Sequence, residues 1–202
     1  MEKIVKELEA RFGILSHREQ RPDLGEVVVE ERNTVALLEW LKRHGGYVHL
    51  THFSVVDWIE DDEFQLTYLL TDPNAHHTLM ISTRIDRANA VAESIHTLWP
   101  EAVTYEQEFN EMYGITFPGS PRQGVEFMLE GWTDMPPMRR DFDTVEYCER
   151  TYEFRPGRHS VDPKEVRQRF QAEQKRLKEQ EAAAANANEE DSGKTSEAEA
   201  AS

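Results

Sequence analysis

The chain has 202 residues, of which 38% are hydrophobic and 31% are charged, and its formal net charge is -16 at pH 7. This length supports one hydrophobic core with extensions and falls short of the bulk expected of two full domains. The acidic charge disfavours nucleic-acid binding, because proteins that bind a phosphate backbone usually gather Lys and Arg on one face. The single cysteine, Cys148, excludes an intrachain disulfide framework and cannot supply the several thiolates of an ordinary iron–sulfur cluster.

The N-terminus has the pattern of an amphipathic helix. Ile4, Leu8 and Phe12 fall at helical spacing with charged residues between them, which predicts a helix over residues 2–12 that ends near Gly13. The segment lacks the apolar core of a signal peptide, and no run in the chain approaches the length that spans a bilayer. We therefore expect a soluble, cytoplasmic chain without direct membrane insertion.

A loop, a strand and a helix are expected next. Residues 13–24 have the character of a loop, and the β-branched residues that follow predict a strand over Gly25–Glu30. Asn33 is a plausible N-cap for a second helix, because an apolar stripe begins two residues later. The pair Gly45–Gly46 provides the C-terminal stop of this helix.

Three strands follow in quick succession, over Tyr47–Trp58, Glu63–Leu70 and His77–Ile85. The middle segment alternates apolar and polar residues with a period of two, which is typical of a half-buried antiparallel strand. Apolar residues at intervals of three and four then predict a helix over residues 88–99 that Pro100 ends. The fold class expected from this order is α+β, with a mainly antiparallel sheet covered by helices.

The C-terminal half is expected to leave the sheet. Thr104 and Gln107 fit a capping box, which predicts a short helix that ends at Gly114. Together these elements predict an α+β domain over residues 1–115. Gly and Pro are frequent afterwards, which predicts an extended partner-docking segment over residues 116–160. An N-cap at Asp162 predicts a polar helix over residues 161–183, and the acidic residues 184–202 are expected to be disordered.

Two groups of residues invite a catalytic or metal-binding interpretation. Glu106, Glu108 and Glu111 form an acidic cluster, but the sequence provides neither a pocket nor a nucleophile to accompany an acid–base pair. The five histidines of residues 44–77 lack the spacing and the cysteine partners of a tetrahedral zinc site. Phosphate-binding glycine motifs are absent. We therefore expect no catalytic residue, no cofactor and no metal.

A basic turn in the C-terminal half is more distinctive. Arg139, Arg140 and Asp141 follow two prolines and precede Phe142. Proline stiffens the backbone, and paired guanidinium groups present fixed donors to the carboxylates or carbonyls of a partner. The turn therefore favours partner docking, although Asp141 could equally pair with one of these arginines at the surface.

Two blocks of sequence resemble one known family. Residues 106–115, EQEFNEMYGI, are similar to the E-R-E-x-x-D-[LMF]-[FY]-G-[IL] block of the 30 kDa (C-type) subunit of respiratory complex I. Residues 137–142, PMRRDF, are similar to its later P-L-R-K-D-[FY] block. In the first block, Gln107 replaces the usual Arg and Glu111 the usual Asp. Between the two blocks, Gly119-Ser120-Pro121 corresponds to the usual G-H-P of the family, with Ser120 in place of His. The departures at Gln107 and Ser120 indicate a divergent branch of a family that includes subunits of membrane-bound hydrogenases and F420H2 dehydrogenases.

The resemblance implies a function in assembly. It implies a non-catalytic, peripheral subunit on the cytoplasmic side of a membrane-bound, ion-translocating redox complex, in contact with the 49 kDa-like large catalytic subunit and the small iron–sulfur subunit. The partner interface is expected to include seven residues: Glu106, Glu108, Tyr113, Arg139, Arg140, Asp141 and Phe142. Two alternatives stay open at this point. One is a free-standing acidic adaptor or chaperone-like module, and the other is a small hydrolase that uses the clustered acids.

Overall fold

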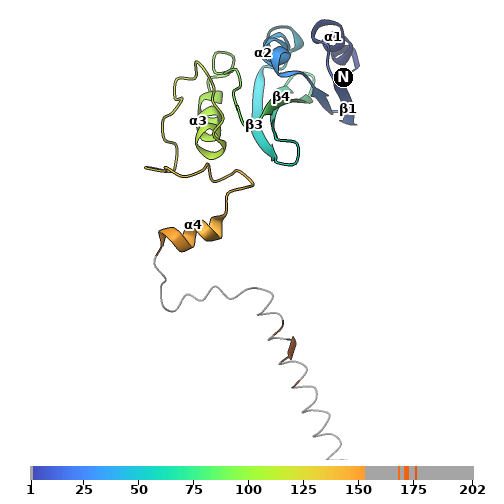
Figure 1. The fold of residues 1–202 in the computed structure, drawn as a ribbon. Helices are drawn as coiled ribbons and strands as arrows, with labels where there is room; N and C mark the ends of the chain where they lie inside the picture. The colour runs from blue at the N-terminus through green and yellow to red at the C-terminus, as the bar shows by residue number, and fades with distance from the viewer. Residues whose placement is uncertain (1, 153–167, 169–170, 173–175, 177–202) are drawn as a thin grey trace, which may run out of the picture. The chain divides into compact units, whose positions relative to one another are not determined.

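The computed structural model describes residues 2–152 together with residues 168, 171, 172 and 176 (Figure 1). Within residues 2–152 it contains five strands, four α-helices and one π-helical turn. In chain order the elements are α1 (Glu2–Phe12), β1 (Ser16–Arg21), β2 (Leu24–Val28), α2 (Glu31–Trp40), η1 (Leu41–Gly45), β3 (His49–Trp58), β4 (Glu63–Asp72), β5 (His77–Asp86), α3 (Ala102–Tyr113) and α4 (Thr144–Thr151). The α+β class expected from the sequence is confirmed.

The five strands form one mixed sheet in the order β1-β2-β5-β4-β3. All neighbouring strands are antiparallel except β2 and β5, which run parallel. Along β4, Phe64, Leu66, Tyr68 and Leu70 are buried and alternate with residues of intermediate exposure. The period of two read from the sequence therefore reports the two faces of this strand correctly.

Helices cover the apolar face of the sheet. Phe53 on β3 stacks against Tyr68 on β4 at 4.3 Å between ring centroids and meets the edge of Phe109 on α3 at 4.9 Å. Leu37 and Leu38 on α2 are fully buried in the same core. The opposite face carries hydroxyl and amide side chains, such as those of Gln65, Thr67 and Ser82, which hydrogen-bond to one another. This one-sided covering is the usual arrangement of an antiparallel sheet with one solvated face.

The loop expected over residues 13–24 is wrong, because residues 16–21 form strand β1. All six residues of β1 are exposed, so no alternation of apolar and polar residues marks the strand. It forms by antiparallel pairing with β2, with Arg21 opposite Leu24 across the turn at Pro22–Asp23. This Pro-Asp pair is a turn signal that could have revealed the hairpin.

The helix expected over residues 88–99 is also wrong. Ala92, Ile95 and Trp99 are buried as their spacing suggested, but the backbone forms no helix there. Instead, the Ala92 amide donates to the Thr116 carbonyl at 2.9 Å and the Thr116 amide donates to the Ala90 carbonyl at 2.8 Å. The spacing of the apolar residues predicted correctly which side chains are buried. The backbone conformation, however, is determined by hydrogen bonds to the distant residue Thr116.

Two helix starts and one whole helix differ from the sequence expectation. Helix α2 begins at Glu31 with Glu30 as its N-cap, and the Asn33 side chain donates instead to the Phe12 carbonyl at 3.0 Å. Helix α3 begins at Ala102, so Thr104 lies inside it and no side chain caps its start. Residues 144–151, expected to be extended, form α4, whose first amides donate to Asp143 Oδ1. The glycine stops are confirmed, with φ of 85° at Gly46 and 75° at Gly114.

The chain divides into two compact units, Met1–Tyr147 and Cys148–Ser202. The site described below lies within the first unit. Most of the predicted polar helix at residues 161–183 and all of the predicted acidic tail at residues 184–202 lie outside the described residues. Over the part of the chain described here, no helix is both long and apolar enough to cross a membrane.

Candidate functional site

Helix α3 holds the irregular segment that follows it by hydrogen bonds to backbone groups. Gln107 Nε2 donates to the Glu126 carbonyl at 2.8 Å and to the Val125 carbonyl at 3.3 Å. One turn later, the Glu111 carboxylate accepts from the amides of Phe127 and Met128, each at 2.8 Å. Burial raises the pKa of Glu111, but these backbone donors outweigh burial and lower it overall. Residues 125–128 are therefore fixed in place by side chains of α3.

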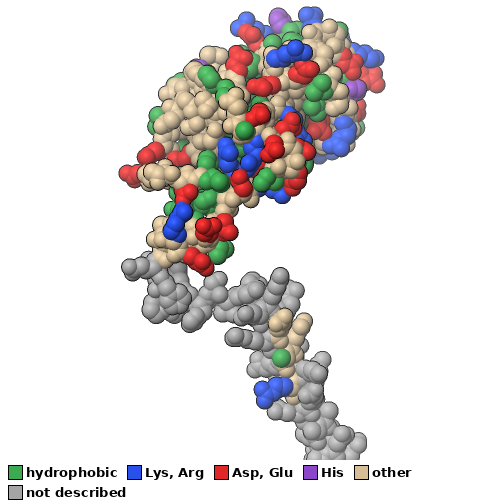
Figure 2. Space-filling view, in the orientation of Figure 1, with side chains coloured by type: hydrophobic (Ala, Val, Ile, Leu, Met, Phe, Trp, Pro, Cys, Tyr) green, Lys and Arg blue, Asp and Glu red, His purple; other side chains and the backbone are tan. Residues whose placement is uncertain are grey.

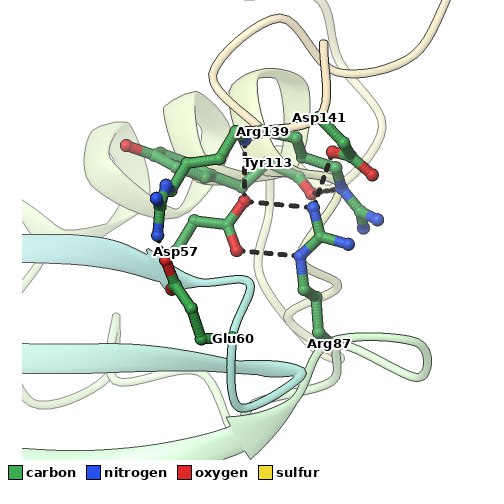
Figure 3. Close-up of polar contacts among 7 residues, drawn as sticks. Asp57, Glu60, Arg87, Tyr113, Arg139 and Asp141 are labelled. Atoms are coloured by element: carbon green, nitrogen blue, oxygen red, sulfur yellow. Dashed lines mark hydrogen bonds and ion pairs between the residues drawn. The ribbon is translucent and has the colours of Figure 1, made fainter.

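A buried ion pair fixes the end of the same segment to the sheet (Figure 3). Arg87, which directly follows β5, donates from Nε and Nη2 to the two carboxylate oxygens of Asp57 on β3, at 2.8 and 3.1 Å. Nη2 also donates to Asp141 Oδ1 at 2.6 Å. The exposed fraction of the side chain is only 2% for Asp57 and 11% for Arg87. We call these three residues, Asp57, Arg87 and Asp141, the clasp.

Both arginines of the basic turn also form contacts within the chain. Arg139 Nε donates to the Tyr113 carbonyl at 2.7 Å, and its guanidinium lies 5.3 Å from the centroid of the Phe64 ring. The Arg140 amide donates to Asp57 Oδ2 at 2.9 Å, and its side chain donates to Glu60 at 2.6 Å. The basic turn therefore joins the C-terminal segment to the end of α3 and to the β3–β4 hairpin. Whether these residues also contact a partner stays a prediction.

The charges of the clasp stabilise one another. Burial, the largest single influence, raises the pKa of Asp57, but hydrogen bonds from Arg87 and from the Arg140 amide outweigh it and lower the pKa overall. The hydrogen bond from Arg87 lowers the pKa of Asp141. In return, the hydrogen bonds to Asp57 and Asp141 raise the pKa of Arg87. All three groups are therefore ionised at neutral pH.

The contribution of the clasp to stability is expected to disappear in acid. Because Asp57 has a lower pKa in the folded chain than in the unfolded chain, the unfolded chain takes up a proton first as the pH falls below about 4. The replacement Asp57→Asn should therefore cost stability at pH 7, and this cost should shrink as the pH falls through the folded pKa. Urea unfolding of both chains between pH 7 and pH 3 measures the difference in their free energies of unfolding. The contributions of the other acids are the same in both chains and cancel in this difference. A difference that stays constant over this range would contradict the assignment.

Glu106 has a structural role inside the chain. It is 1% exposed, and its carboxylate accepts from the Ile95 amide at 2.9 Å and from the Ser94 hydroxyl at 2.7 Å. Ser94 Oγ also lies 2.8 Å from His96 Nδ1. A Ser–His–acid hydrolase needs the histidine between the serine and the acid, but here the serine lies between them and donates to Glu106. The arrangement is therefore not that of a Ser–His–acid triad.

The segment from residue 125 to residue 138 exposes large apolar side chains. The exposed fractions are 51% for Val125, 70% for Met128, 41% for Met135 and 54% for Met138. We call these four residues the methionine surface. Figure 2 shows hydrophobic side chains exposed among charged ones on the viewed face of the first unit. Phe142 is half-buried in a cluster with Trp132 and Tyr147, whose ring centroids lie 5.7 and 5.6 Å from its own.

The structure separates the seven residues expected at a partner interface. Arg139, Arg140 and Asp141 lie together at the clasp, Phe142 lies in the neighbouring aromatic cluster, and Glu106 is buried apart from them. Glu108 and Tyr113 line a groove with Met138, and the Tyr113 carbonyl also joins this group to Arg139. Sequence analysis missed Asp57 and Arg87, which lie 83 and 53 positions before Arg140, so no local spacing could have revealed them. Among the described residues, no group of three or more His, Cys, Asp or Glu side chains could hold a metal ion.

Comparison with known proteins identifies the family. Residues 27–148 match the family described as respiratory-chain NADH dehydrogenase, 30 Kd subunit. The C-type subunit of NADH-quinone oxidoreductase from Moorella thermoacetica is 30% identical over 142 residues, which cover 70% of this chain and 95% of the relative. Its counterpart from Rhizobium rhizogenes is 29% identical over 168 residues, which cover 80% of this chain and 82% of the relative.

A solved structure has a similar fold. It is a chain of the membrane-bound sulfane sulfur reductase, described as an archaeal respiratory membrane complex. Its TM-score is 0.71 at 25% sequence identity, and the match covers 80% of this chain and 96% of that chain. Because the family match spans residues 27–148, it includes most of the sheet, α3 and the basic turn. The chain therefore belongs to the family of the 30 kDa subunit of respiratory-chain NADH dehydrogenase.

Proposed function

We propose that this chain is a non-catalytic subunit in the peripheral arm of a membrane-bound, ion-translocating respiratory redox complex. In this function it stabilises the 49 kDa-like large catalytic subunit and the small iron–sulfur subunit on the cytoplasmic side of the membrane. The names of the relatives support the proposal, because each denotes a subunit of an oxidoreductase or of a respiratory membrane complex. Electron transfer and ion translocation belong to the assembly.

The methionine surface is the observation that carries this proposal. A contiguous apolar patch on a soluble domain commonly marks a protein–protein interface, and we propose that these four exposed side chains form one such patch. The backbone is fixed at both ends of this surface, because Gln107 and Glu111 hold residues 125–128 and the Met138 amide donates to the Met112 carbonyl at 3.0 Å. A fixed segment loses little conformational entropy on binding. Each methionine that a partner buries fully would contribute about 1.5–3 kcal/mol.

Charged residues near this surface provide orientation. The Arg140 side chain is 51% exposed and pairs with Glu60 in the isolated chain, so it can exchange Glu60 for a partner carboxylate while its backbone amide stays bound to Asp57. A guanidinium presents a planar set of donors that suits a carboxylate. Phe142 and Tyr113 flank the basic turn with aromatic side chains of intermediate exposure. We propose that these residues form the part of the interface closest to the clasp.

The proposal predicts that the chain co-purifies with the other subunits. It also predicts that introducing charged residues into the methionine surface lowers the amount of partner recovered. An affinity-tagged chain should recover large catalytic and iron–sulfur subunits, identified by mass spectrometry. The double replacement Met128→Asp and Met135→Asp should lower this recovery at least about tenfold, which corresponds to about 1.4 kcal/mol of binding free energy. Because both side chains are exposed, the urea midpoint of the isolated chain should stay unchanged.

Leu15→Asp provides the matched control, because Leu15 is 61% exposed but lies outside the methionine surface. It should recover the partners as the original chain does. A monodisperse original chain that never recovers iron–sulfur subunits would contradict the proposal and favour a free-standing acidic binding module.

A further inference from the structure

An apolar groove of about 300 Å³ runs between strand β3 and helix α3. One wall consists of four consecutive residues of β3, from His52 to Val55, and the other consists mainly of α3 residues. Successive side chains of a strand point to opposite faces of its sheet. Four consecutive residues can therefore line one groove only where the backbone edge of the strand itself forms the wall.

Strand β3 is available at this edge. It is the last strand of the sheet, and in the part of the chain that the structure describes it pairs with β4 alone (Figure 1). An edge strand has a row of amide and carbonyl groups without strand partners, which can pair with an added strand. Helix α3 follows the same edge, so the groove is bounded by a strand on one side and a helix on the other. Extended peptides bind to such edges by adding a strand.

The side chains of the groove define what it can hold. Phe53, Val55 and Phe109 are buried and form its apolar base, whereas Met112 and Tyr113 are half-exposed at its wall. Glu108 also lines the groove, and within residues 2–152 it has neither a hydrogen bond nor an ion pair. Burial, followed by the charge of Glu108, raises the pKa of Tyr113, so its hydroxyl stays protonated and can donate. This environment suits one large apolar side chain next to a basic one.

We propose that an extended segment of a partner subunit adds to the free edge of β3 as a sixth strand. One apolar side chain of that segment occupies the groove, and a neighbouring Lys or Arg pairs with Glu108. The groove also contains Met138, so it is continuous with the methionine surface. The inference rests on the proposed function, since it states how the partner of that same docking surface binds.

Hydrogen exchange measured by mass spectrometry tests the added strand directly. Amides in residues 52–55 that point away from β4 should exchange rapidly in the isolated full-length chain and at least about tenfold more slowly in the affinity-purified complex. The amides of β1, the strand at the opposite edge of the sheet, provide the control and should exchange equally in both samples. The replacement Met112→Arg fills the groove and should remove the protection at residues 52–55.

The inference and the proposed function can fail separately. If the complex assembles but residues 52–55 exchange as fast as in the isolated chain, strand addition is overturned and the proposed function stands. If the isolated chain gains the same protection at high concentration, a second copy of the chain occupies the edge, and the partner-subunit form of the inference is overturned. If no complex can be recovered, both proposals fail together.

Discussion

Replacing Arg87 by alanine should lower the free energy of unfolding by about 3–5 kcal/mol, because the change leaves a buried carboxylate without its partner. Asp57 is 2% exposed and receives two hydrogen bonds from Arg87. The remaining donor, the Arg140 amide, cannot neutralise its charge. The variant also removes the ion pair to Asp141, so Arg139 and Arg140 alone would hold the basic turn against Tyr113, Asp57 and Glu60. Urea unfolding followed by circular dichroism measures the loss.

Arg18→Ala is the matched control for this experiment. Arg18 pairs with Glu26 at 2.9 Å, but its side chain is 70% exposed. Exposed pairs contribute at most about 1 kcal/mol, so this variant should remain close to the original chain. The carboxylate explanation predicts in addition that Asp57→Asn costs less in the Arg87→Ala background than alone, which a double-mutant cycle measures. Equal losses for Arg87→Ala and Arg18→Ala would refute a stabilising function of the clasp.

Local patterns predicted the elements whose own residues determine their structure. The alternation along residues 63–70 reflects two faces of one strand, and Gly46 and Gly114 end helices because glycine adopts positive φ without a steric penalty. The two signature blocks likewise indicated the family correctly. Each of these signals lies within a short stretch of chain, so a single sequence contains them.

Features that depend on distant partners could not be predicted in this way. The segment around Ile95 has helical spacing, but Thr116 and Glu106 satisfy its backbone groups and hold it out of a helix. The clasp is similar, because Arg87 lies 30 positions from Asp57 and 54 from Asp141. The basic turn was correctly selected as distinctive. Its arginines and aspartate were predicted to contact a partner. In the folded chain they form hydrogen bonds that join the C-terminal segment to the sheet and to α3.

Replacing the acids of α3 should have unequal effects on stability. The sequence grouped Glu106 and Glu108 in one acidic cluster, but in the structure Glu106 is buried and Glu108 lines the groove. Glu106→Ala should lower the free energy of unfolding by about 2–3 kcal/mol, since it leaves the buried Ile95 amide without an acceptor. Glu106→Gln should lose less, because it keeps one acceptor oxygen. Glu108→Ala, on the same helix, should change stability by no more than about 0.5 kcal/mol. Chemical unfolding of the three variants measures the series.

Binding should follow the opposite order. Glu108 lines the groove without a hydrogen bond or ion pair inside residues 2–152, so its loss should weaken recovery of the partner subunits while the isolated chain remains stable. At low temperature and without denaturant, where Glu106→Ala is still folded, that variant should bind as the original chain does, because the Glu106 carboxylate is buried and hydrogen-bonds to Ser94 and Ile95. Two acids separated by one residue would then divide between folding and docking. If both variants lost stability and binding in proportion, the division would be wrong, and α3 would act in docking only by being folded.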